Sequence, residues 1–127
     1  CALALEAIDI IINEKMIENV RRLEPVFMGG LRKFEELDHI GEARGIGLMG
    51  ALEMVQDKKS KKSFDGSISI GERVANKCIE NGLICRPLGP SIVLCPPFIT
   101  TDDEMEIIFD TLDKTLKNVF SEVKSLI

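Results

Sequence analysis

The chain has 127 residues, of which 45% are hydrophobic and 29% charged, and its 16 basic and 21 acidic side chains give a formal net charge of -5. This length suits one domain, and the apolar content excludes an intrinsically disordered chain. No apolar run reaches the roughly 18 residues of a membrane-spanning helix, and the acidic balance argues against a broad nucleic-acid surface. We therefore expect neither a membrane nor a nucleic acid as a partner.

The first segment, Ala2 to Ile12, predicts a helix that is apolar on nearly every side, with Glu6 and Asp9 on one narrow stripe. A helix of this kind is normally buried, and no basic segment precedes it as in a signal peptide. The pattern suggests that residues 1–127 are a fragment of a longer protein, whose missing part or second subunit covers this helix. The alternative is a helix at the centre of a small core.

A second helix is predicted from Lys15 to Glu36, because apolar residues recur there at three- and four-residue spacing. Pro25 lies inside this helix, so we expect a kink or a break just before it. The next segment, Ile40 to Val55, has no helical period. We expect it to be extended, with a bend or bulge near Gly50, and to be followed by a polar loop.

The third predicted helix is short and ends before Gly82, which we expect in the left-handed conformation. Two apolar strands follow, Leu83 to Leu88 and Ser91 to Leu94. The Gly-Pro pair between them is typical of a hairpin turn.

The last helix opens with Thr101 and Glu104 at the spacing of a capping box, and its apolar residues continue at helical spacing from Met105 to Leu126. The order of the predicted elements is helix, helix, strand, helix, strand, strand, helix. The sequence therefore predicts an α+β fold, in which a small, mostly antiparallel sheet carries helices packed on one face.

The four cysteines, at positions 1, 78, 85 and 95, form no C-x-x-C motif, and the sole histidine has no nucleophile or metal ligand near it in sequence. Because a core of this size does not need disulfides, we expect reduced thiols and a cytoplasmic protein. We interpret His39 as an ordinary loop or strand-edge residue. We predict no metal site, because no histidine stands at metal-ligand spacing from the cysteines. We also predict no catalytic residue, since no lysine lies in an apolar context that would lower its pKa for imine chemistry.

Two further patterns favour a structural interpretation. Gly45 to Gly50 match G-x-G-x-x-G, but the dinucleotide fingerprint needs a buried strand before it and a long helix after it. We expect these glycines to permit close backbone approach or a bulge instead. The four lysines between Lys58 and Lys62 lie among serine, aspartate and glycine, which favours a solvated loop over an anion-binding patch.

Arg86 is the only charged side chain from Gly82 through Thr101. A guanidinium among apolar residues needs an anion or several acceptors as partners, and its planar fork suits a carboxylate. Two partners are open at this point. One is a ligand carboxylate or phosphate at the edge of the sheet, and the other is an internal acid such as Glu53.

Two segments resemble class III aminotransferases. Arg44 to Glu53, with the sequence RGIGLMGALE, resembles the R-G-x-G-L-M-x-x-x-E stretch of that family. Residues 82–99 resemble the family's hairpin and its closing P-P-L/F-x-I/V-T segment. The resemblance covers nearly all of the chain and is closest to omega-amino-acid and amine:pyruvate transaminases. It implies that residues 1–127 are the C-terminal small domain of a pyridoxal-phosphate-dependent enzyme of fold type I.

The resemblance also implies a function. Arg86 would bind the carboxylate of an amino acid or of pyruvate and swing aside for substrates that lack one. The full-length homodimer would use pyridoxal phosphate to move an amino group from an amine or omega-amino acid to an alpha-keto acid such as pyruvate. The family's cofactor-binding residues belong to a large domain that is missing from this chain, so we expect the chain alone to be inactive. A non-catalytic amino-acid-binding or subunit-interaction module is the alternative.

Overall fold

Four strands form one antiparallel sheet in the computed structural model, which describes residues 1–126. The strand order is β1-β2-β4-β3. In chain order, the elements are α1 (Ala2–Asn13), α2 (Met16–Lys33), β1 (Ile40–Ile46), β2 (Met49–Met54), α3 (Ile70–Glu80), β3 (Arg86–Leu88), β4 (Ser91–Leu94) and α4 (Asp102–Val123). Short 3-10 helices at Phe34–Glu36 and Gly66–Ile68 precede β1 and α3. The predicted α+β class is confirmed.

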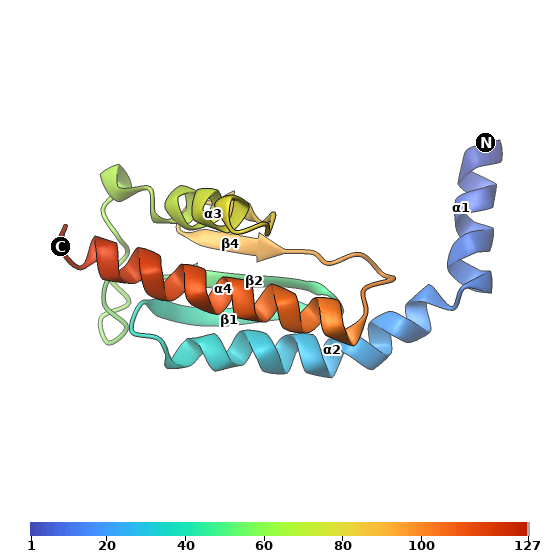
Figure 1. Cartoon of the computed structure of the whole chain (residues 1–127), viewed down its shortest axis with the longest axis horizontal. Coiled ribbons are helices and arrows are strands. Elements are labelled where there is room, and N and C mark those ends of the chain that lie inside the picture. The colour runs from blue at the N-terminus through green and yellow to red at the C-terminus, as the bar shows by residue number, and fades with distance from the viewer. Residues whose placement is uncertain (127) are drawn as a thin grey trace.

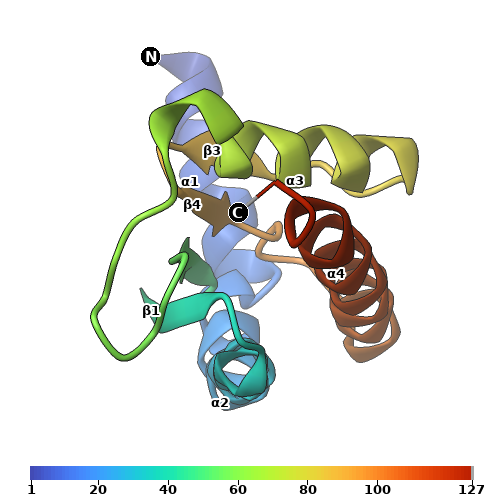
Figure 2. The ribbon, with the colours of Figure 1, turned by 90° about the vertical axis from the view of Figure 1, so that its left-hand side faces the viewer.

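One face of the sheet forms the core with α2, α3 and α4 (Figures 1 and 2). Alternate residues of β2 and β4 point to this face, and Leu52, Met54, Ile92 and Leu94 are buried there. The helices therefore pack on one face, as predicted. Within residues 1–126, no helix combines the length and apolarity needed to cross a membrane.

Helix α1 lies apart from the sheet and from α3 and α4 (Figure 1), whereas α2 follows it directly and contacts it. None of its residues is buried, and Leu3, Leu5, Ile8 and Ile12 are between 53% and 88% exposed. The predicted helix is confirmed, but the alternative that it forms the centre of a small core is wrong. Its apolar surface faces outward in this chain.

Helix α2 continues through Pro25, so of the kink or break expected just before this residue, the break is wrong. Leu23, on one side of the proline, and Phe27 and Leu31, on the other, are all fully buried in the core. Because this packing holds both halves of the helix, it offsets the hydrogen bond that proline cannot donate.

Residues 40–55 form a hairpin and not a single extended stretch. Strands β1 and β2 pair with Gly45 opposite Gly50, and the chain reverses at Gly47, which has a φ of +57°. The expected bend near Gly50 thus lies at Gly47, and the fold has one more strand than predicted. An added Cβ at Gly45 would collide with the Met49 carbonyl oxygen, so the close backbone approach expected of these glycines is confirmed.

The predicted end of α3 and the hairpin after it are confirmed. Gly82 has a φ of +84°, and the Leu83 N–H donates to the Cys78 carbonyl oxygen at 2.8 Å, as in a Schellman motif. The strand after this turn is shorter than predicted, because only Arg86–Leu88 pairs with β4.

The capping box at the start of α4 is also confirmed. The Thr101 N–H donates to the Glu104 carboxylate at 2.9 Å, and the Glu104 N–H donates to Thr101 Oγ1 at 3.3 Å. The buried face of the helix ends at Val123, whereas Leu126 lies beyond the helix and is 57% exposed. The four lysines of residues 58–62 lie in an exposed loop, as expected.

Candidate substrate-carboxylate site

Arg86 begins the edge strand β3 and is exposed. It pairs with Val93 of β4. Val93 also lies opposite Ala51 of β2, and Ala51 lies opposite Arg44 of β1, so the four residues form one row across the sheet. Residues that lie opposite one another on neighbouring strands point to the same side of a sheet. Along each strand, successive side chains point to opposite sides, and the neighbours of this row point to the core face. Arg86 therefore lies on the sheet face that the helices leave uncovered.

Glu53 pairs with Arg44 and not with Arg86. Its carboxylate accepts a hydrogen bond from Arg44 Nη1 at 2.7 Å, and the Glu42 carboxylate accepts another at 3.2 Å. The hydrogen bond with Glu53 is the largest cause that raises the pKa of Arg44. In the part of the chain that the structure describes, no acidic side chain forms an ion pair with Arg86. The internal-acid alternative is thus wrong for Glu53, because β4 separates β2 from β3 and Glu53 pairs with Arg44 of the adjacent strand β1.

The surface around Arg86 is largely apolar. Leu88 follows it on the same face of β3, and Ile46 and Met49 lie on this face at the turn of the β1–β2 hairpin. These three side chains are between 57% and 70% exposed. A guanidinium on an uncovered apolar face can form a bidentate, charge-assisted pair with a carboxylate that is brought to it. Such a group can orient an anion, but it supplies neither a nucleophile nor a proton acceptor.

Helix α3 supports the hairpin that carries Arg86. Gly71, in the first turn of α3, lies so close to the β3–β4 turn that an added Cβ would collide with the Gly89 carbonyl oxygen. Gly89 itself has a φ of +57°. This contact was not predicted from the sequence, where a glycine in the first turn of a predicted helix is the only local signal for it.

A second contact joins Cys85, the residue before Arg86, to Cys78 of α3. Both thiols are buried, and we call them the thiol pair. The hydrogen bond with Cys78 raises the pKa of Cys85, and burial raises it further. All four cysteines are free thiols. The thiol pair and the Gly71 contact together fix both ends of β3 against α3.

The lysines of this chain do not fit a site that binds pyridoxal phosphate covalently. None of the ten is buried, and Lys77, which is half-buried, donates to Glu80 at 2.7 Å. This hydrogen bond raises the pKa of Lys77, whereas a lysine that reacts with a carbonyl group needs a lowered pKa. Residues 1–126 also contain no cluster of three or more histidine, cysteine or acidic side chains that could hold a metal ion.

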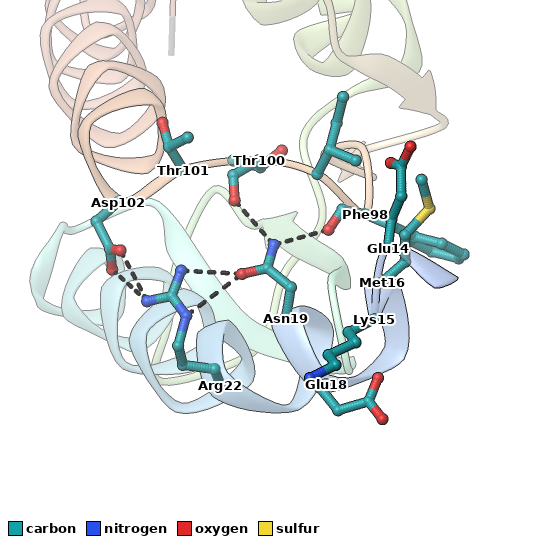
Figure 3. Close-up of a pocket in the computed structure, with 11 residues that line it drawn as sticks. Glu14, Lys15, Met16, Glu18, Asn19, Arg22, Phe98, Thr100, Thr101 and Asp102 are labelled. Atoms are coloured by element: carbon teal, nitrogen blue, oxygen red, sulfur yellow. Dashed lines mark hydrogen bonds and ion pairs between the residues drawn. The ribbon is translucent and has the colours of Figure 1, made fainter. Parts of the chain in front are cut away.

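A cleft of about 530 Å³ separates the start of α2 from the segment before α4 (Figure 3). Asn19 Nδ2 donates to the carbonyl oxygens of Phe98 and Thr100, at 2.8 and 3.1 Å. Arg22 Nη1 donates to both carboxylate oxygens of Asp102, at 2.7 and 3.0 Å. Because these polar groups already bind one another, we interpret them as a latch between α2 and α4. This latch could not be predicted from the sequence, because its partners lie about 80 residues apart.

The family model for class-III aminotransferases matches residues 1–116, and the chain belongs to this family. It is 38% identical over 117 residues to adenosylmethionine-8-amino-7-oxononanoate aminotransferase of Methanocaldococcus jannaschii, covering 92% of this chain and 25% of the relative. It is 35% identical over 126 residues to mitochondrial gamma aminobutyrate transaminase 1 of Solanum lycopersicum, covering 99% of this chain and 24% of the relative. The chain thus spans about a quarter of the length of these curated relatives.

Solved structures agree with this family. An omega-transferase from Vibrio fluvialis JS17 is 57% identical with a TM-score of 0.97, and the match covers 98% of this chain and 30% of that one. A PMP-bound aminotransferase from Vibrio fluvialis is 58% identical with a TM-score of 0.95, over 97% of this chain and 27% of that one. An omega-aminotransferase from Paracoccus denitrificans is 56% identical with a TM-score of 0.95, over the same shares of the two chains. The fold is therefore that of the corresponding part of these enzymes.

Proposed function

We propose that residues 1–127 are the C-terminal small domain of a longer, homodimeric and cytoplasmic transaminase. This enzyme moves an amino group from an amine or omega-amino acid to an alpha-keto acid such as pyruvate. Membership of the aminotransferase family and 56–58% identity to enzymes of Vibrio fluvialis and Paracoccus denitrificans support the reaction class. The exposed apolar surface of α1, which a large domain or second subunit would cover, supports the domain assignment, and the free thiols support the location.

Pyridoxal phosphate, when bound by the full-length enzyme, supplies the electron-withdrawing chemistry of transamination. Because the lysines of this chain do not fit that cofactor, the domain contributes binding and orientation of the substrate. The proposed group is the exposed guanidinium of Arg86, on a sheet face that the helices leave uncovered and without an ion pair to any acid of residues 1–126. It binds the substrate carboxylate through two parallel hydrogen bonds, and the small domain closes the active site.

Replacing Arg86 with alanine in the full-length enzyme tests this role. A charge-assisted pair contributes about 1.5–3 kcal/mol, so kcat/KM for pyruvate and for carboxylated amino donors should fall about ten- to hundred-fold. Amines without a carboxylate should retain their rate in the donor half-reaction. Arg86→Lys should rescue only part of the loss, because an ammonium group lacks the planar fork.

Arg44→Ala is the matched control. Arg44 lies in the same cross-strand row, but Glu53 and Glu42 already hold its guanidinium. Its replacement should leave the preference between carboxylated and uncarboxylated donors unchanged. If Arg86→Ala slows both kinds of donor equally and lowers the melting temperature, Arg86 is a structural residue and the proposed role is wrong.

A further inference from the structure

Helix α1 and the segment before α4 form the walls of an apolar groove of about 380 Å³. Phe98 and Ile99 of that segment form one wall, and they are 47% and 64% exposed. The other lining residues are also apolar, and they are Ala7, Ile10, Ile11, Met16 and Pro97. Because large apolar patches are rarely left exposed, the groove indicates a contact with structure outside residues 1–126.

The segment that carries Phe98 is held in place by hydrogen bonds. Asn19 Nδ2 donates to the Phe98 carbonyl oxygen at 2.8 Å (Figure 3). The Thr100 N–H donates to the Pro97 carbonyl oxygen at 3.0 Å, which closes a turn around Phe98 and Ile99. The latch between α2 and α4 therefore presents the groove as a preformed surface.

The same arrangement occurs in a longer chain. The match to the omega-transferase from Vibrio fluvialis JS17, with a TM-score of 0.97, covers 98% of this chain. Because α1 makes up 12 of the 127 residues, the match includes α1 in the same position relative to the sheet. The match covers only 30% of the longer chain, so the larger part of that chain is free to contact the groove.

The apolar surface of α1 is too wide for contact along one face. With 3.6 residues per turn, successive side chains are about 100° apart, so the apolar residues from Leu3 to Ile12 cover a sector of roughly 220°. Glu6 and Asp9 occupy the remaining stripe. A two-fold contact between two copies of a chain would bury one face of the helix, whereas this sector needs structure on both sides.

We propose that the large domain of the longer chain encloses α1 and places an apolar side chain in the groove, against Phe98 and Ile99. This inference rests on the proposed function, in which residues 1–127 are the small domain of a longer transaminase. Helix α1 is then the rigid attachment of the small domain to the large one. The stripe of Glu6 and Asp9 is the only side of the helix that remains in water.

Leu3 and Leu5 test the enclosure, because two residues correspond to about 200° and these side chains point to nearly opposite sides of α1. Both are exposed in this chain, at 88% and 64%, so neither contributes to the core of the small domain. Leu3→Gln and Leu5→Gln in the full-length enzyme should each lower the melting temperature by roughly 5 °C, since each buries an amide without a partner.

Glu6→Gln is the matched control, because Glu6 lies on the polar stripe of the same helix. It should shift the melting temperature by less than about 1 °C. If only one of the two leucine variants lowers the melting temperature, α1 is covered along one face and the enclosure is wrong. If neither does, the helix is not covered at all.

Ile99→Ala tests the groove, and Ile84→Ala is its matched control. Both isoleucines lie outside helices and strands, and Ile84, which is 86% exposed, does not line the groove. In the full-length enzyme, Ile99→Ala should lower the melting temperature by roughly 3 °C more than Ile84→Ala, because only Ile99 leaves a cavity. The difference should not depend on protein concentration, and light scattering should show an unchanged oligomeric state.

Two results for the groove would overturn the proposal. Equal melting temperatures would mean that the groove faces water. A loss that grows on dilution, or a change in oligomeric state, would mean that a second copy fills the groove. Transamination by the parent enzyme is measured separately. Failure of these stability tests in an active enzyme would contradict this inference alone, whereas the expected losses in an inactive enzyme would contradict the proposed function alone.

Discussion

Replacing Gly71 with alanine tests whether α3 holds the Arg86 hairpin in place. The added Cβ would collide with the Gly89 carbonyl oxygen and lie 3.2 Å from the Ser91 carbonyl oxygen. Backbone atoms cannot turn aside as a flexible side chain does, so α3 or the β3–β4 turn must shift. Overpacking of this kind costs roughly 1–3 kcal/mol, and alanine recovers at most about 1 kcal/mol of helix propensity. We therefore expect a net loss of about 1–2 kcal/mol in the free energy of unfolding.

Gly29→Ala is the matched control, because Gly29 is also helical and nothing lies within 4 Å of its added Cβ. This variant should be neutral or more stable by up to about 1 kcal/mol. Urea denaturation gives both free energies, and for a chain of this size each kcal/mol shifts the melting temperature by roughly 3–5 °C. If Gly71→Ala proves as stable as Gly29→Ala, the close contact between α3 and the hairpin does not exist.

Two other predictions concern the thiols and the capping box. In the native protein, the two exposed cysteines should react with a thiol reagent and the thiol pair should not, because burial blocks access. All four thiols should react once the chain is unfolded in denaturant. Rapid reaction of all four thiols without denaturant would contradict the burial of the pair. Glu104→Gln should destabilise the chain at neutral pH but not in acid. Hydrogen bonds from the N–H and hydroxyl of Thr101 lower the pKa of Glu104, so the stabilisation is present at neutral pH and is lost as the pH falls through that lowered pKa. Urea denaturation at about pH 7 and about pH 3 measures this difference, and an equal loss at both would exclude the ionised carboxylate as its cause.

Local signals account for the parts of the fold that the sequence predicts. The capping box of Thr101 and Glu104 marks the start of α4, and Gly82 marks the end of α3. Both signals depend on hydrogen bonds within a few residues, so no distant contact can override them easily. Pro25 is the contrasting case, because contacts from elsewhere in the chain hold α2 together at a residue that normally interrupts a helix.

The β1–β2 hairpin was hidden because its strands contain glycines that break the alternation of apolar and polar residues. Gly41 and Gly45 interrupt β1, Gly50 interrupts β2, and the turn at Gly47 lacks the asparagine or proline that marks many turns. The pairing of Glu53 with Arg44 was hidden for another reason. Alternation predicts which side of a strand a residue faces, but the neighbouring strand becomes known only from the order β1-β2-β4-β3.

Arg86 could be identified from the sequence because it is the one charge in a long apolar segment. Its surroundings could not, since the thiol pair and the Gly71 contact join residues of different elements. Nε2 of His39 is likewise buried without a hydrogen-bond partner among residues 1–126, and this follows from the packing of the ring against Phe64 and Phe120. A candidate residue such as Arg86 can be identified in the sequence by its type. A buried atom without a hydrogen-bond partner can be identified only in the folded structure.

The donor half-reaction of the full-length enzyme, followed in a single turnover, tests the role of Arg86 most directly. The quantity to measure is the ratio of the rate constants for alanine and for an amine of similar size without a carboxylate, both below saturation. Arg86→Ala should lower this ratio about ten- to hundred-fold, the effect of losing one bidentate charge-assisted pair. Arg44→Ala should leave it unchanged. A ratio that Arg86→Ala does not alter would contradict the assignment of carboxylate recognition to this domain.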